Sequence, residues 1–149
     1  MTRVKVLETW EWNFNTDTSP LKEIDSIVKE YRPSIIKVDS QPYSFVEDLR
    51  TMLKRTIYPV EFKVHKENMI GKLKHLLETH QIELPVNKEK LINQLKSYTE
   101  EHKNYGDDYV DSLALAVYHD NELFRPSTHG CIYFPPNFDK QGGYLGNIK

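Results

Sequence analysis

Three aspartates lie where an apolar helix is predicted to begin, in the segment 107–116. In a helix, Asp111 would lie one turn from both Asp107 and Asp108, and such like charges repel by about a few tenths of a kcal/mol. A divalent cation bound between these carboxylates would remove the repulsion. Helix capping is an alternative explanation for Asp107 or Asp108, but it does not explain Asp111, which falls inside the helix beside its apolar stripe.

A fourth acid, Asp39, ends a short strand that is predicted over 35–39. This run is rich in β-branched residues and is bounded by Pro33 and Pro42. In open α/β sheets the carboxyl ends of the strands border the crevice where ligands bind, so an acid at this position is well placed for chemistry. The alternative is that Asp39 only closes the strand in an Asx turn.

The elements that would position these acids alternate between strands and helices. Strands are predicted over 3–12, 35–39 and 59–64, and helices over 20–32, 44–54, 66–80, from Asn87 through Leu95, and from the acidic cluster to about His119. Such alternation predicts an α/β fold with an at least partly parallel sheet. Residues 125–149 are rich in Pro, Gly, Asn and aromatic residues without periodicity, so an irregular C-terminal tail is expected after a domain over 1–124.

Length and composition limit the class of protein. The 149 residues fit one domain with a real core, and no apolar run approaches the roughly 18 residues of a membrane span. The lone Cys131 excludes an internal disulfide, and no signal peptide is evident at the start, so a cytoplasmic protein is expected. The net charge of −2 gives no global basic signature, so any nucleic-acid surface must be local.

The order of motifs along 4–117 resembles the nuclease domain of the viral terminase large subunit, a DNA-packaging protein. The last motif is the sharpest, because 107–116 is close to the family pattern Asp-Asp-x-x-Asp-Ala-x-Ala, with Ser112 in place of the first Ala. The preceding motifs are the strand end Val-Asp-Ser at 38–40, Pro-Val-Glu-Phe at 59–62, the lysine-rich helix from Lys66, and Ile-Glu-Leu-Pro at 82–85. The resemblance implies an RNase H-like α/β fold with a mixed or parallel sheet flanked by helices.

The resemblance also implies a metal-dependent endonuclease acting on double-stranded DNA. Two Mg²⁺ or Mn²⁺ ions are expected, because such sites activate water and stabilise the leaving oxygen, and carboxylates are the hard ligands that these ions prefer. By motif position, Asp39 matches the family's second acid, and Asp107 or Asp108 with Asp111 matches its last cluster. These four residues are the predicted catalytic and metal-binding residues. A RuvC-like Holliday junction resolvase is a second alternative that fits the lysine helix less well.

The family's first metal-binding Asp lies on a β-hairpin that would precede the strand over 3–12, and no segment of the sequence matches it. The expectation is therefore a domain that is N-terminally truncated relative to the family. Its missing strands would come from a homodimer or a partner chain, or the domain would be a catalytically incomplete DNA-binding or packaging-complex module. A rearranged sheet that pairs 3–12 directly with 35–39 is the alternative. ATPase and portal components of a packaging motor are further expected partners, and no membrane is.

A group of basic side chains near the predicted strand-to-helix junction after Pro59 could contact a phosphate backbone. The alternative is an ordinary solvated helix face. The group comprises Lys63, His65, Lys66, Lys72 and Lys74.

Overall fold

The computed structural model describes residues 3–11, 20–98 and 108–118 and the backbone of 131–134 and 144–148. Its elements, in chain order, are β1 (Val4–Glu11), α1 (Pro20–Tyr31), β2 (Ile35–Asp39), α2 (Tyr43–Leu53), β3 (Ile57–Val60), α3 (Phe62–Glu78), β4 (Ile82–Glu83), α4 (Glu89–Ser97), α5 (Asp108–Val117), β5 (Cys131–Phe134) and β6 (Tyr144–Ile148). The predicted alternation of strands and helices is therefore confirmed through α5.

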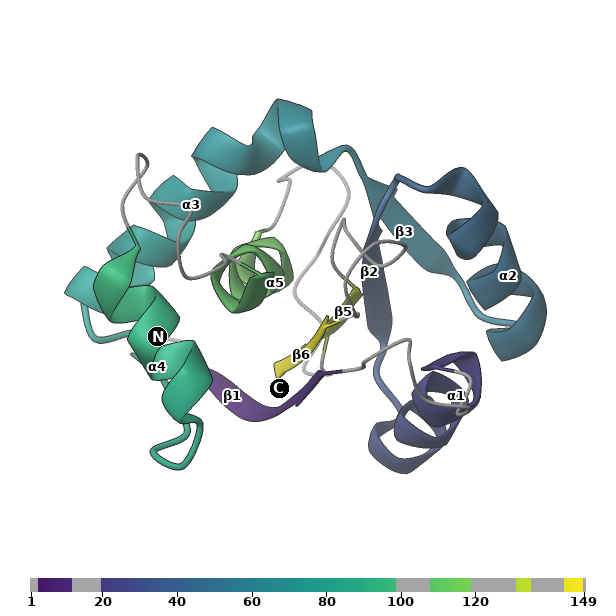
Figure 1. The fold of residues 1–149 in the computed structure, drawn as a ribbon, viewed down its shortest axis with the longest axis horizontal. Coiled ribbons are helices and arrows are strands. Elements are labelled where there is room, and N and C mark those ends of the chain that lie inside the picture. Colours follow the sequence, from purple (N-terminus) through teal and green to yellow (C-terminus); the bar gives the residue numbers. More distant parts are fainter. Residues whose placement is uncertain (1–2, 12–19, 99–107, 119–130, 135–143, 149) are drawn as a thin grey trace.

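The strands form one mixed sheet in the order β3-β2-β5-β6-β1-β4 (Figure 1). β2 is parallel to both β3 and β5, whereas β6 is antiparallel to β5 and to β1. The short β4 pairs in parallel with β1 at the other end of the sheet. The carboxyl ends of β2, β3 and β5 consequently share one edge of the sheet, which is the edge where Asp39 ends β2.

The expected irregular tail over 125–149 is wrong in two segments, because β5 and β6 are strands in the middle of the sheet. They separate β1 from β2, so the alternative in which 3–12 pairs directly with 35–39 is also wrong. β1 has β6 on one side and β4 on the other, so the chain itself fills the edge that was expected to need a partner's strand. β5 and β6 have four and five residues, and neither has the β-branched run that made the equally short β2 predictable.

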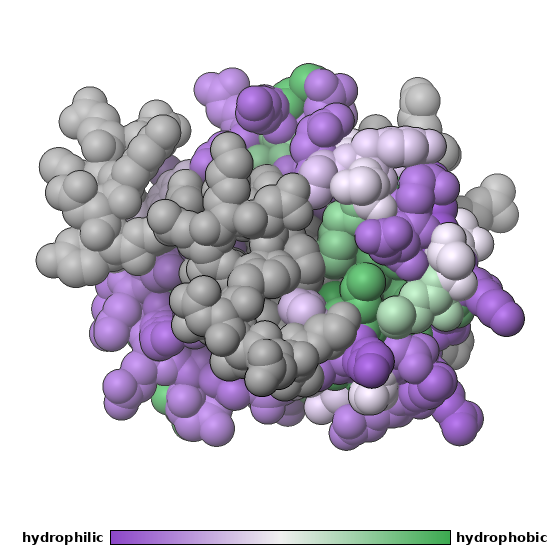
Figure 2. Space-filling model, turned by 45° about the vertical axis from the view of Figure 1, so that its right-hand side comes forward, coloured by the Kyte–Doolittle hydropathy of each residue, from purple (hydrophilic) through white to green (hydrophobic). Residues whose placement is uncertain are grey.

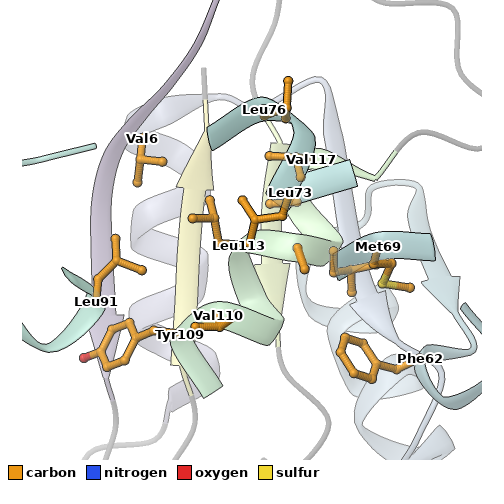
Figure 3. Packing of buried hydrophobic residues seen from close by; sticks show 13 residues of the cluster. Val6, Phe62, Met69, Leu73, Leu76, Leu91, Tyr109, Val110, Leu113 and Val117 are labelled. Atoms are coloured by element: carbon orange, nitrogen blue, oxygen red, sulfur yellow. The ribbon is translucent and has the colours of Figure 1, made fainter. Parts of the chain in front are cut away.

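Helices cover both faces of the sheet (Figure 1). On one face, α1 and α2 pack with β2 and β3 around a core that includes Ile36 and Val38. On the other face, α3, α4 and α5 enclose a second core with Val6 of β1 (Figure 3). All residues of α5 from Tyr109 to Val117 are buried. The most apolar helix is thus the central one, because α3, α4, β5 and β6 all pack against it.

An irregularity in β1 lets this strand contribute to both cores. The register against β6 shifts between Val6 and Glu8, where β1 has one extra residue. Such a bulge interrupts the alternation of side chains between the two faces. Val6 therefore belongs to the α3–α5 core, whereas Trp10 packs against the other core, with its ring centroid 5.6 Å from that of Tyr31 in an edge-to-face contact.

The surface turned toward the viewer in Figure 2 is hydrophilic over most of the described residues, with a smaller hydrophobic area to the right of the centre. Large exposed apolar side chains come from separate elements: Tyr43 and Met52 of α2, Val64 of α3, and Val86 between β4 and α4. Among the described helices, none has the length and apolar character needed to cross a membrane.

Candidate metal and nucleic-acid site

The carboxyl edge of the sheet brings the end of β2 next to the start of α3. Asp39 is in register with Val60, the last residue of β3, and the N–H of Ser40 donates to the carbonyl of Val60 at 2.9 Å. α3 begins at Phe62, so the predicted strand over 59–64 ends four residues earlier and the helix starts four residues earlier than expected. The reason is Phe62, whose side chain is 4% exposed in the core beneath α3.

Asp39 is held in a defined position by backbone N–H groups. Its side chain is buried, and its Oδ1 accepts the N–H of Gln41 at 3.1 Å. This is the Asx turn that was the alternative explanation for Asp39. Burial raises the pKa of the Asp39 carboxyl above its usual range, although backbone hydrogen bonds from Gln41 and Phe62 and the charge of Lys63 act in the opposite direction. The turn does not exclude a ligand role, because it orients the carboxylate.

The acidic cluster divides between described and undescribed residues. Asp111 lies in α5, is 5% exposed, and forms an ion pair through Oδ2 with the Nζ of Lys66 at 3.1 Å. Asp108 is the first residue of α5, and its carbonyl accepts the hydroxyl of Ser112 at 2.6 Å. Asp107 lies outside the described residues. Of the predicted acids, the structure therefore places Asp39, Asp108 and Asp111.

The first two turns of α3 connect Asp39 with Asp111. The backbone N–H of Phe62 donates to Asp39, and Lys66, one turn further along the helix, pairs with Asp111. Lys66 also lies over the ring of Phe62, with its Nζ 5.4 Å from the ring centroid. The two acids come from elements that are 72 positions apart in the sequence, and the structure directs both at the same end of α3. That end carries the positive pole of the helix dipole, which favours anions.

The predicted basic group lies entirely on α3, but its side chains make different contacts. Lys66 is the partner of Asp111, and His65 Nδ1 lies 3.3 Å from the hydroxyl of Tyr118. Lys63 and Lys72 are exposed, and Lys74 forms an exposed ion pair with Glu78 at 3.8 Å. Lys66 therefore belongs to the acidic site, and contact of this basic group with a phosphate backbone stays a prediction.

Sequence reasoning missed the groups that hold the start of α5. Gln94 of α4 accepts the N–H of Tyr109 through Oε1 at 2.9 Å, which satisfies one of the free N–H groups of the first turn. The hydroxyl of Tyr109 donates to Glu11 of β1 at 3.0 Å, and Lys90 of α4 pairs with the same carboxylate at 2.6 Å. No local pattern predicts these contacts, because each joins segments at least 15 residues apart.

The donors at this site suit Mg²⁺ or Mn²⁺, since Asp39 and Asp111 offer carboxylate oxygens. The ammonium group of Lys66 lies against Asp111, so this carboxylate already has a cation beside it. In the part of the chain that the structure describes, no group of three His, Cys, Asp or Glu side chains is arranged to hold a metal ion. The predicted two-metal site is thus not assembled from the described residues alone.

A mixed sheet with parallel β3, β2 and β5, an antiparallel β6–β1 pair and helices on both faces defines an α/β domain of the RNase H-like class. The model of the terminase RNaseH-like domain matches residues 2–120. The chain belongs to this family, which makes it a nuclease-type terminase domain. Nucleases with this fold generally use divalent metal ions. No curated protein and no solved structure matches the chain.

Proposed function

We propose that this domain hydrolyses phosphodiester bonds of double-stranded DNA with the help of Mg²⁺ or Mn²⁺. The observation that carries the proposal is that two buried acids both interact with the first two turns of α3: the backbone of Phe62 lowers the pKa of Asp39, and Asp111 pairs with Lys66. Burying two acids is costly unless something compensates for their charge. Lys66 and a backbone N–H group provide this compensation without a ligand. A bound divalent cation would take the place of Lys66 beside Asp111, which fits the family to which the chain belongs.

The residues would divide the work as follows. Asp39 and Asp111, with Asp108 or Asp107, would hold the metal through carboxylate oxygens. When bound, the metal supplies an activated water and stabilises the leaving oxygen. The Asx turn at Gln41 keeps the Asp39 carboxylate oriented, and Lys66 would release Asp111 and move to a phosphate oxygen.

Exposed cations on α3 are proposed to contact the DNA backbone. Lys63 lies on the first turn, close enough to lower the pKa of Asp39 by its charge, and Lys72 is exposed further along the same helix. Lys74 would exchange its exposed partner Glu78 for a phosphate, because such surface pairs contribute little to stability. Contacts of this type bind DNA without reading its sequence.

The proposed partners follow from the family. They are double-stranded DNA and the ATPase and portal components of a packaging motor. A homodimer stays a prediction.

The experiment is a nicking assay on supercoiled plasmid with the purified chain in Mg²⁺ and in Mn²⁺. Wild type is expected to cut, while Asp39→Ala and Asp111→Ala are expected to abolish cleavage. Asp39→Asn should also be inactive even though its amide oxygen can still accept the N–H of Gln41, which separates loss of charge from loss of the turn. Asp25→Ala is the matched control, since Asp25 lies on α1 in an ion pair with Lys29, and it should cut like wild type.

A second candidate function is a non-catalytic DNA-binding or packaging-complex module. It is favoured by the lack of a three-ligand group among the residues that the structure places. Binding of DNA without cleavage at any metal concentration would support this candidate and refute the nuclease proposal for the chain alone. The RuvC-like resolvase is disfavoured, because the family match over 2–120 is to the terminase domain.

A further inference from the structure

One charged side chain in the sheet is completely buried and plays no part in the proposed hydrolysis. Lys37 of β2 is 0% exposed, in a strand whose other residues are Ile35, Ile36, Val38 and Asp39. Removing an ammonium group from water is costly unless hydrogen-bond acceptors replace the water. The position therefore requires an explanation that an apolar residue in the same strand does not.

The Lys37 ammonium group contacts the carboxyl end of α5. Its Nζ lies 3.4 Å from the carbonyl oxygens of both Leu115 and Ala116, and it also donates to the carbonyl of Tyr118, directly after the helix. The last carbonyls of a helix have no partners within the helix, and they form the negative pole of its dipole. An ammonium group with three donors suits this position.

Lys37 and Asp39 point to the same face of the sheet, because side chains two positions apart on a strand share a face. Ile36 and Val38 point to the opposite face, into the core beneath α1 and α2. The strand that carries Asp39 is thus linked by Lys37 to the helix that carries Asp111, one turn before Leu115. This link spans 78 positions of the sequence.

We propose that Lys37 is a positioning residue that fixes α5 against β2 and so sets the separation of Asp39 and Asp111. The inference rests on the proposed function for its consequence at the metal site. An apolar side chain would fill the same space without fixing the helix end, whereas hydrogen bonds from one ammonium group to several carbonyls define where α5 stops along the strand.

The test compares Mn²⁺ binding by the full chain, measured by electron paramagnetic resonance, between wild type and Lys37→Met. The sign of the effect separates two roles. Loss of a positive charge near carboxylates would by itself strengthen Mn²⁺ binding, whereas loss of positioning weakens it. We expect affinity to fall by about tenfold or more, as when other groups that orient metal ligands are removed. The matched control is Ile24→Ala, which damages the core on the other face of the sheet and should leave Mn²⁺ affinity unchanged.

A second measurement, amide hydrogen exchange, reads the link without any metal. Lys37→Met should speed exchange selectively in α5 and at Tyr118, and Ile24→Ala should not. If wild type binds no Mn²⁺, the proposal of a metal-dependent nuclease fails, and amide hydrogen exchange in α5 alone tests the role of Lys37. Unchanged or tighter Mn²⁺ binding, or unchanged exchange in α5, would overturn the inference. If Lys37→Met does not fold, Lys37→Gln replaces it in both measurements; its shorter amide has two N–H donors for three carbonyls, so Mn²⁺ affinity and the protection of α5 should still fall.

Discussion

The central position of β6 can be tested with one substitution, Gly146→Pro. Gly146 is in register with Thr9 of β1 on one side and with Tyr133 of β5 on the other. Proline has no N–H, so it removes a hydrogen bond from an interior strand, where proline is normally excluded. The lost bond and the carbonyl left without its donor in the middle of the sheet together cost about 2–4 kcal/mol. This is a large part of the roughly 5–15 kcal/mol that stabilises a typical domain.

The assay is urea unfolding of the full chain, followed by circular dichroism. Gly146→Ala is the matched control, because alanine keeps the N–H, and Gly146→Pro should lose much more stability than this control. Four register pairs join β5 to β2 and five join β6 to β1, so a chain that ends at residue 124 should unfold or associate. If Gly146→Pro unfolds at the same urea concentration as Gly146→Ala, the placement of β6 between β5 and β1 is refuted.

Two further predictions concern the cores and the pH dependence of stability. Met69→Ala removes a side chain that is 0% exposed between α3 and α5, so it should lower the free energy of unfolding in urea by about 2–5 kcal/mol. Met52→Ala, at a side chain that is 38% exposed, should lower it much less. Equal losses of stability would contradict the packing shown in Figure 3. Burial raises the pKa of Glu8, but Lys88 and the N–H of Thr9 outweigh burial and hold this pKa below its usual value. The stabilisation by Glu8 is therefore present at neutral pH and is lost as the pH falls below about 4.3, the ordinary pKa of glutamate. The melting temperature of Glu8→Gln should consequently fall less steeply with acid than that of wild type. Parallel curves of melting temperature against pH would exclude this role of Glu8.

Several features of the site could be predicted from the sequence because short-range patterns encode them. The β-branched run before Asp39 predicts the strand that ends at this acid, and the apolar spacing after Asp108 predicts α5. The motif order identifies the family that the match over 2–120 shows. No prediction was made for Lys37, although a lysine inside a buried strand, two positions before Asp39, indicates a partner across the core.

The local pattern alone thus determined the type and order of the main elements up to α5, although β3 and α3 begin earlier than it predicts, and it identified the acids at the end of β2 and the start of α5. Only the tertiary structure decided that β5 and β6 lie between β2 and β1, that Lys66 pairs with Asp111 across 45 positions, and that Lys37 caps α5. The physical reason is that helix and strand periodicity depends on neighbours a few residues apart. Strand order and long-range ion pairs depend instead on how separate elements pack. Bringing such elements together costs loop-closure entropy, which only many simultaneous contacts can offset.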